Sequence, residues 1–248
     1  MIRQLPARQR IRKALLILAF LSFPITMNFL SPYVVIDGAM GGVLTGSLVM
    51  FGLMFLSALF LGRLWCGWAC PGAGMQEIAG PLNNRAVHPG KIDWIKWVIW
   101  VPWISLIVWL VFQAGGSARL DLLYLTENGV SVSEPSRFFV YYMVVGVFIL
   151  LAALVGRRAG CHTICWMAPF MILGRWIRNR FAWPALRLRA DAAACQDCKV
   201  CTQNCPMSLD VNAMVQRGHM EHPECILCGS CVDNCASRAI RYSFSSGK

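Results

Sequence analysis

Four long apolar stretches, separated by polar segments, occupy the first part of the chain. They cover about residues 14–36, 43–61, 94–112 and 138–155. Each is close to the length of roughly 20 residues that an α-helix needs to cross a lipid bilayer. Pro24, Asn28 and Pro32 interrupt the first stretch, but a membrane helix tolerates such residues when neighbouring helices satisfy the freed backbone groups. The pattern therefore predicts four transmembrane helices.

The pattern changes after the fourth stretch. From Ala168 to Trp183 apolar and basic residues mix, which is typical of a short interfacial helix. Arg238 to Phe244 alternates between polar and apolar residues, as a closing strand would. We therefore divide the chain into a membrane domain (1–183), a linker (184–194) and a small α+β domain (195–248).

Composition and charge agree with a membrane protein. The chain is 57% hydrophobic and 14% charged, with a net charge of +11. Basic residues gather before the first stretch, between the second and third, and after the fourth, whereas residues 113–137 hold only Arg119 and Arg137. The positive-inside rule then predicts that both termini are cytoplasmic, and it explains the basic charge without a nucleic-acid partner. Membrane lipid is the expected environment.

Ionisable side chains are absent from the middle of the four stretches. Lys96 lies near an end, where its ammonium group can reach the interface. Ion pumps and proton channels usually carry ionisable residues near the midplane, so the pattern argues against ion translocation by this chain. Glu77, His88 and Asp93 lie on the cytoplasmic side, where we expect solvated interfacial side chains.

Two cysteine runs dominate the last domain. The first reads C-x2-C-x2-C-x3-C-P and the second C-x2-C-x2-C-x3-C, which is the ligand pattern of a ferredoxin with two [4Fe–4S] clusters. In such ferredoxins the fourth cysteine of each run binds the other cluster. The predicted ligands of cluster 1 are Cys195, Cys198, Cys201 and Cys235. The predicted ligands of cluster 2 are Cys225, Cys228, Cys231 and Cys205.

Zinc sites and disulfides are the alternatives for these eight cysteines. Zinc sites usually show one C-x2-C pair per half-site rather than two overlapping pairs with a trailing cysteine. Disulfides need an oxidising compartment, and the charge pattern puts this segment in the cytoplasm. The second run ends Cys235-Ala236 where the first ends Cys205-Pro206. This difference changes the backbone donors beside one cluster without preventing binding.

Four further cysteines follow the second and fourth stretches in pairs. Cys66 and Cys70 stand in W-C-G-W-A-C-P, and Cys161 and Cys165 in C-H-T-I-C. A spacing of four residues puts each pair on one face of a helix, and both pairs are predicted at the cytoplasmic membrane surface. They could form a third iron–sulfur or other metal site, a redox thiol pair, or part of the apolar core.

Two matched pairs favour the redox-active metal site over the other two readings. His162 could replace a ligand there, although an ordinary interfacial histidine explains it as well. Neither pair forms C-x-x-C-H, and no glycine-rich nucleotide motif follows a strand, so haem and nucleotide cofactors are not expected.

Together these motifs resemble the NapH-type membrane ferredoxins, whose core also occurs in NosR and CcoG-like proteins. The resemblance covers nearly the whole chain. It carries over to Cys66, Cys70 and Pro71 as a C-x3-C-P motif, and less closely to Cys161 and Cys165, because Trp166 stands where the family has proline. NosR-like relatives add an extracytoplasmic flavin domain, for which the outer loops here are too short, so no flavin is expected.

The resemblance implies an electron-transfer subunit in a bacterial inner membrane rather than a stand-alone enzyme. It would relay electrons between the quinol pool or a cytoplasmic donor and a respiratory or redox partner protein in a membrane complex. The fold expected is four transmembrane helices followed by a C-terminal α+β ferredoxin-like domain with two [4Fe–4S] clusters. An accessory maturation factor, which reduces a metal or protects a partner metalloenzyme, is the alternative.

Overall fold

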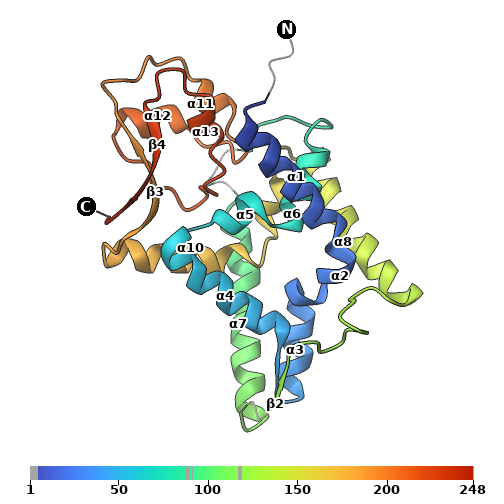
Figure 1. Ribbon diagram of the computed structural model, residues 1–248. Coiled ribbons are helices and arrows are strands. Elements are labelled where there is room, and N and C mark those ends of the chain that lie inside the picture. Colours follow the sequence, from blue (N-terminus) through green and yellow to red (C-terminus); the bar gives the residue numbers. More distant parts are fainter. Residues whose placement is uncertain (1–4, 88–89, 91, 117–118, 248) are drawn as a thin grey trace.

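A computed structural model describes residues 5–87, 90, 92–116 and 119–247 (Figure 1). The elements up to the first long helix are α1 (Ala7–Leu21), α2 (Phe23–Thr26), η1 (Asn28–Leu30), α3 (Pro32–Met40), β1 (Val43–Thr45), α4 (Gly46–Leu61), α5 (Leu64–Trp68) and α6 (Pro71–Ala79). The middle elements are α7 (Ile95–Gln113), β2 (Arg119–Asp121), α8 (Pro135–Leu154), α9 (Ala159–Thr163) and α10 (Ala168–Arg180). The last elements are β3 (Ala185–Ala190), α11 (Val200–Gln203), α12 (Val211–Gln216), α13 (Ser230–Asp233) and β4 (Ile240–Ser245).

The C-terminal elements form a lobe at one end of the molecule, and α7, α3 and β2 reach the opposite end (Figure 1). In that lobe β3 pairs antiparallel with β4, from Ala185 opposite Ser245 to Ala190 opposite Ile240. At the opposite end the short strands β1 and β2 pair in parallel. Between the two ends α10 packs along α4, and α1 packs along α6.

The prediction of four transmembrane helices is wrong. Within the described residues, two helices are long and apolar enough to cross a membrane, α7 and α8. They coincide with the third and fourth predicted spans, and few residues of their most apolar windows are buried, 11% and 17%. A core helix of a soluble protein would be mostly buried, so the low burial favours contact with lipid.

Prolines divide the first predicted span. Pro24 and Pro32 stand in the first turns of α2 and α3. A residue without an N–H is tolerated there, because the N–H groups of the first turn have no intrahelical acceptor. The second predicted span is shortened because Val43–Thr45 forms β1. Helix α4 then has 16 residues, or about 24 Å at 1.5 Å per residue, which is less than the roughly 30 Å hydrocarbon core.

The predicted linker 184–194 is also partly wrong. Residues 185–190 form β3, in which Ala185 and Leu188 are buried and Arg189 is exposed. The arginines in A-L-R-L-R-A interrupt the apolar pattern, so the pattern alone did not predict this strand. Arg187 is buried beside Glu221, so its charge is compensated within the fold.

The short helix α5, which holds Cys66 of the first cysteine pair, contacts the C-terminal lobe directly. Gly67 lies against the backbone of Ile226 and Cys228, and a Cβ at this position would overlap the Ile226 carbonyl oxygen. Trp68 Nε1 donates a hydrogen bond to the Leu227 carbonyl oxygen at 3.2 Å. The absence of a side chain at Gly67 therefore allows the two backbones to pack together.

Replacing Gly67 with alanine should destabilise the folded chain by about 1–3 kcal/mol, because backbone atoms must separate to admit the methyl group. Thermal unfolding in mild detergent measures the effect. Gly52→Ala is the matched control, since a Cβ there meets nothing within 4 Å. Equal unfolding temperatures for the two variants would contradict the close contact at Gly67.

Candidate iron–sulfur sites

The two predicted ferredoxin quartets surround two separate cavities of the C-terminal lobe. One cavity is lined by Cys205, Cys225, Cys228 and Cys231, and its lining is almost wholly apolar. The other is lined by Cys195, Cys198, Cys201 and Cys235. In each case three cysteines come from one run and the fourth from the other run. Four thiols around one cavity are a donor set that fits a [4Fe–4S] cluster, which supplies one-electron redox chemistry when bound.

The two runs share one backbone conformation. Asp197 and Leu227, which precede the second cysteine of each run, have φ of 51° and 49°. Lys199 and Gly229, which follow it, have φ of 58° and 76°. Left-handed residues at matching positions turn the chain around each cavity, and such turns point backbone N–H groups inward to an anionic group.

The cavity lined by Cys205, Cys225, Cys228 and Cys231, which we call the inner cavity, has apolar surroundings that raise the pKa of some of its thiols. Burial raises the pKa of Cys205 to about 12 and that of Cys225 to about 11. Binding to iron requires the thiolate form, so the cluster's own positive iron must replace the thiol protons. The cysteines of the other cavity, which we call the outer cavity, are more exposed: Cys198 is exposed, and Cys195 and Cys235 are half-buried.

The second set of cysteines is buried where α5, α6 and α9 meet. Cys66 lies in α5, Cys70 precedes α6, Cys161 lies in α9 and Cys165 follows it. All four side chains are at most 7% exposed. Burial raises the pKa of Cys70 well above its usual value, and repulsion from Cys66, Cys165 and Cys161 raises it further. The four thiols therefore lie close together, and we name them the junction thiols.

Two of the possible roles of the junction thiols, a redox thiol pair and a single zinc site, lose support. A redox thiol is usually activated by a lowered pKa, whereas burial raises the pKa of Cys165 to about 12. A single zinc ion with Zn–S bonds of about 2.3 Å would hold its sulfur ligands about 3.8 Å apart. In the described part of the chain, no three cysteine sulfurs lie within 4.8 Å of one another. The spacing thus argues against a single zinc ion, and all four cysteines also belong to the hydrophobic core.

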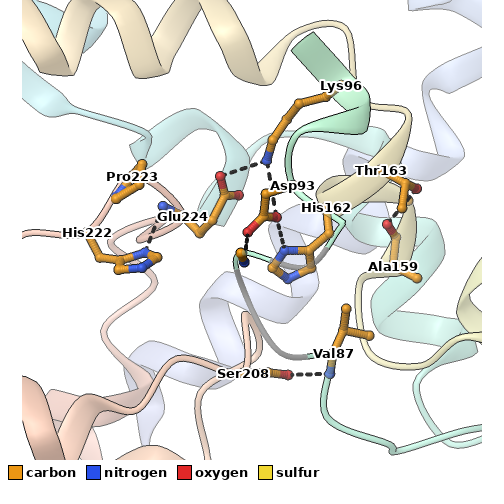
Figure 2. Close-up of polar contacts among 12 residues, drawn as sticks. Val87, Asp93, Lys96, Ala159, His162, Thr163, Ser208, His222, Pro223 and Glu224 are labelled. Atoms are coloured by element: carbon orange, nitrogen blue, oxygen red, sulfur yellow. Dashed lines mark hydrogen bonds and ion pairs between the residues drawn. The ribbon is translucent and has the colours of Figure 1, made fainter. Parts of the chain in front are cut away.

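A buried charge network joins Glu224, Lys96, Asp93 and His162 (Figure 2). Glu224 is 2% exposed, and its two carboxylate oxygens contact Lys96 Nζ at 2.7 Å and Arg63 Nη1 at 2.8 Å. His162 Nδ1 lies 2.7 Å from Asp93 Oδ1, and Lys96 Nζ lies 3.5 Å from the same oxygen. Oxygen and nitrogen atoms of Asp93, His162 and Glu224 come within 4.8 Å of one another, but the Lys96 ammonium already supplies the positive charge there.

This network corrects several expectations. Lys96 is fully buried in an ion pair instead of reaching the interface, and His162 is fully buried instead of interfacial. Asp93 pairs with both of them rather than with solvent. Their partners lie up to 128 residues away along the chain, so no local pattern could have revealed them. His88 lies outside the described residues.

A second network surrounds Glu77, which was expected to be solvated. Its carboxylate contacts Arg12 at 2.9 Å and Arg158 at 2.7 Å. Burial alone would raise the pKa of Glu77, but these two guanidinium groups lower it to about 2. Both arginines also reach the segment of the first cysteine pair, where Arg12 contacts the Gly67 carbonyl oxygen and Arg158 that of Cys66, each at 3.5 Å.

Two family descriptions match the chain. A 4Fe-4S binding domain matches residues 43–89, which include Cys66 and Cys70. A 4Fe-4S dicluster domain matches residues 178–246, which include all eight cysteines of the ferredoxin runs. No solved structure gives a significant match.

Several relatives share much of the sequence at low identity. YccM of Escherichia coli (strain K12) is 23% identical over 212 residues, which are 82% of this chain and 57% of YccM. The methylamine utilization ferredoxin-type protein MauN of Methylobacillus flagellatus is 27% identical over 242 residues, 91% of this chain and 77% of MauN. The regulatory protein NosR of Stutzerimonas stutzeri is 26% identical over 186 residues, 71% of this chain and 24% of NosR.

These findings confirm the resemblance to NapH/NosR-like polyferredoxins, at low identity. The chain carries ferredoxin-type 4Fe–4S domains, and the matches support an iron–sulfur electron-transfer function. It spans little more than half the length of YccM and about a quarter of NosR. The number of clusters and the ligands of each one stay predictions.

Replacing Lys96 with methionine should destabilise the chain by about 3–5 kcal/mol, because Asp93 and Glu224 lose a buried counter-charge. Urea unfolding in mild detergent measures the loss. Arg10→Met removes an exposed cation of similar length and should change stability by less than about 0.5 kcal/mol. A loss for Lys96→Met as small as that of the control would contradict the buried network.

The network around Glu77 should make the free energy of unfolding depend on pH in the acidic range. Its folded-state pKa lies below the unfolded value, so its contribution is complete above pH about 4.5 and is lost as the pH falls toward 2. The shift corresponds to about 3 kcal/mol. Glu77→Gln should therefore be less stable than the wild type at pH 7, and this difference should shrink as urea unfolding is repeated down to pH 3.5. With the exposed Glu127→Gln as control, a difference that stays constant with pH would contradict the assignment.

Proposed function

We propose that this chain relays single electrons through three iron–sulfur sites, from the junction thiols through the ferredoxin-like lobe to a partner protein. One observation carries the proposal: the segment that holds Cys66 and Cys70 packs directly on the loop between Cys225 and Cys231. Gly67 meets the Ile226 backbone there, and Trp68 bonds to the Leu227 carbonyl oxygen. Gln9 adds a bond to the Cys228 carbonyl oxygen at 3.0 Å.

Burial supports an order for the relay. The junction thiols are the most deeply buried set, the cavity of Cys205 and Cys225 comes next, and the cavity that includes the exposed Cys198 reaches the surface. A protein partner can approach a redox group only where that group is near the surface. The outer cavity is therefore the proposed point of electron exchange with the partner.

The two long apolar helices support a membrane position for the other end of the relay. Helix α9, which holds Cys161, contacts both α7 and α8. The cysteine sites lie at one end of α7 and α8, away from β2 (Figure 1), and the positive-inside rule makes that end cytoplasmic. A quinol in the bilayer, or a cytoplasmic donor, would then reduce the junction site first.

Cluster content tests the proposal. Three [4Fe–4S] clusters require about twelve iron and twelve sulfide ions per chain, and about three electrons in a reductive titration followed by electron paramagnetic resonance. Anaerobically purified protein in mild detergent should give these values. The double variant Cys66→Ser, Cys165→Ser should give about eight ions of each kind and about two electrons.

The wild type is the control: the iron and sulfide counts of the double variant are compared with those of the wild type, purified in the same way. About eight iron ions in both proteins would contradict a junction cluster while leaving a two-cluster relay. Bound zinc in place of iron would overturn the electron-transfer function as a whole.

A further inference from the structure

We infer that a polar cavity beside the junction thiols binds the phosphate headgroup of an anionic phospholipid. The cavity has a volume of about 520 Å³ and is open on one side. It lies between α1, the end of α6, the segment after α8, and the end of α11 in the ferredoxin-like lobe. Neither the ferredoxin quartets nor the junction thiols use it.

The charge of the lining selects an anion. Lys13, Arg157 and Arg158 line the cavity together with one acid, Glu77. Arg12, Lys13 and Arg158 all contact the Glu77 carboxylate, at 2.9, 3.7 and 2.7 Å, so one acid faces several cations and the lining keeps a net positive charge. The Nε groups of Arg157 and Arg158 are buried and have no hydrogen-bond partner in the described part of the chain. The site therefore has more donors than acceptors, which a phosphate group would balance.

The surroundings of the cavity select a lipid. Ile78 and Leu82, at the end of α6 and just beyond it, are exposed apolar side chains next to lining residues. Leu154, the last residue of the long helix α8, and Val155 are also exposed, and only Gly156 separates them from Arg157. Basic pockets at the cytoplasmic ends of membrane helices are typical sites for acidic lipid headgroups. A quinone ring is less suitable, because the lining is mainly polar.

Residues that line this cavity connect it to both the junction thiols and the ferredoxin-like lobe. Gln76 lines the cavity, and its amide donates a hydrogen bond to Cys161 Sγ at 3.1 Å. Pro206, which follows Cys205, lines the opposite wall together with Gln203. The headgroup would thus join the membrane helices to the ferredoxin-like lobe at their shared edge. This inference rests on the proposed membrane position of α7 and α8.

Native mass spectrometry of the full chain, purified with its clusters in mild detergent, tests the site. Phosphatidylglycerol and phosphatidylcholine are added in turn, and inorganic phosphate is added as a competitor. One phosphatidylglycerol should be retained per chain, and phosphatidylcholine should not. The double variant Lys13→Ala, Arg157→Ala should bind phosphatidylglycerol roughly 30-fold more weakly, from about one charge interaction per basic residue.

Arg10→Ala, on the exposed side of the same helix α1, is the matched control and should bind like the wild type. Equal retention of both lipids, or no change in the double variant, would overturn the inference. If millimolar inorganic phosphate displaces the lipid and occupies the cavity to the same extent, the cavity is a free-phosphate site. That result would also overturn the inference.

Iron content and incorporation into lipid nanodiscs are measured on the same samples. Wild-type iron content in the double variant shows that it has folded. A wild type that shows no lipid selectivity but has normal iron content and normal incorporation would reject this site alone. Failure of the wild type to enter nanodiscs would reject the membrane position, and the inference with it.

Discussion

The carboxylate of Glu224 ties the two parts of the chain together. It forms ion pairs with Arg63, which immediately precedes α5, and with Lys96 at the start of α7. Glu224 itself immediately precedes Cys225, the first cysteine of the second run. Because a buried charge without a partner is strongly unfavourable, this triad holds the ferredoxin-like lobe in one position against the helices. The contact between Gly67 and Ile226 depends on that position.

Buried cations also prepare the junction thiols for a negatively charged group. Burial alone would lower the pKa of Arg63, but Glu224 and the nearby Cys66 raise it, so the guanidinium stays charged. Arg158 behaves in the same way beside Glu77 and Cys161. Four thiolates around iron carry net negative charge, and fixed positive groups nearby would stabilise it in an apolar environment. The fold provides these groups before any cofactor is bound.

Sequence reasoning succeeded where local spacing carries the information. A 4Fe-4S dicluster domain matches the segment that holds both cysteine runs, and the apolar stretches over 94–112 and 138–155 correspond to α7 and α8. It failed over 14–36, where length and hydropathy suggested one helix. Two prolines start new helices there, so the stretch is divided among α1, α2, η1 and α3. It also failed for Lys96 and His162, because a charge near the end of an apolar stretch looks the same whether its partner is water or a distant carboxylate.

The sequence by itself determined which residues are chemically suited to hold iron–sulfur clusters, since the spacing of cysteines within one run follows from local backbone turns. Only the tertiary structure decided how these sets relate to one another. It brought Cys66, Cys70, Cys161 and Cys165 into one buried group and set α5 against the second run. It also placed Arg63 near Cys66 and Arg158 near Cys161. Such long-range contacts depend on the packing of whole elements and on paired charges far apart along the chain, which local patterns do not encode.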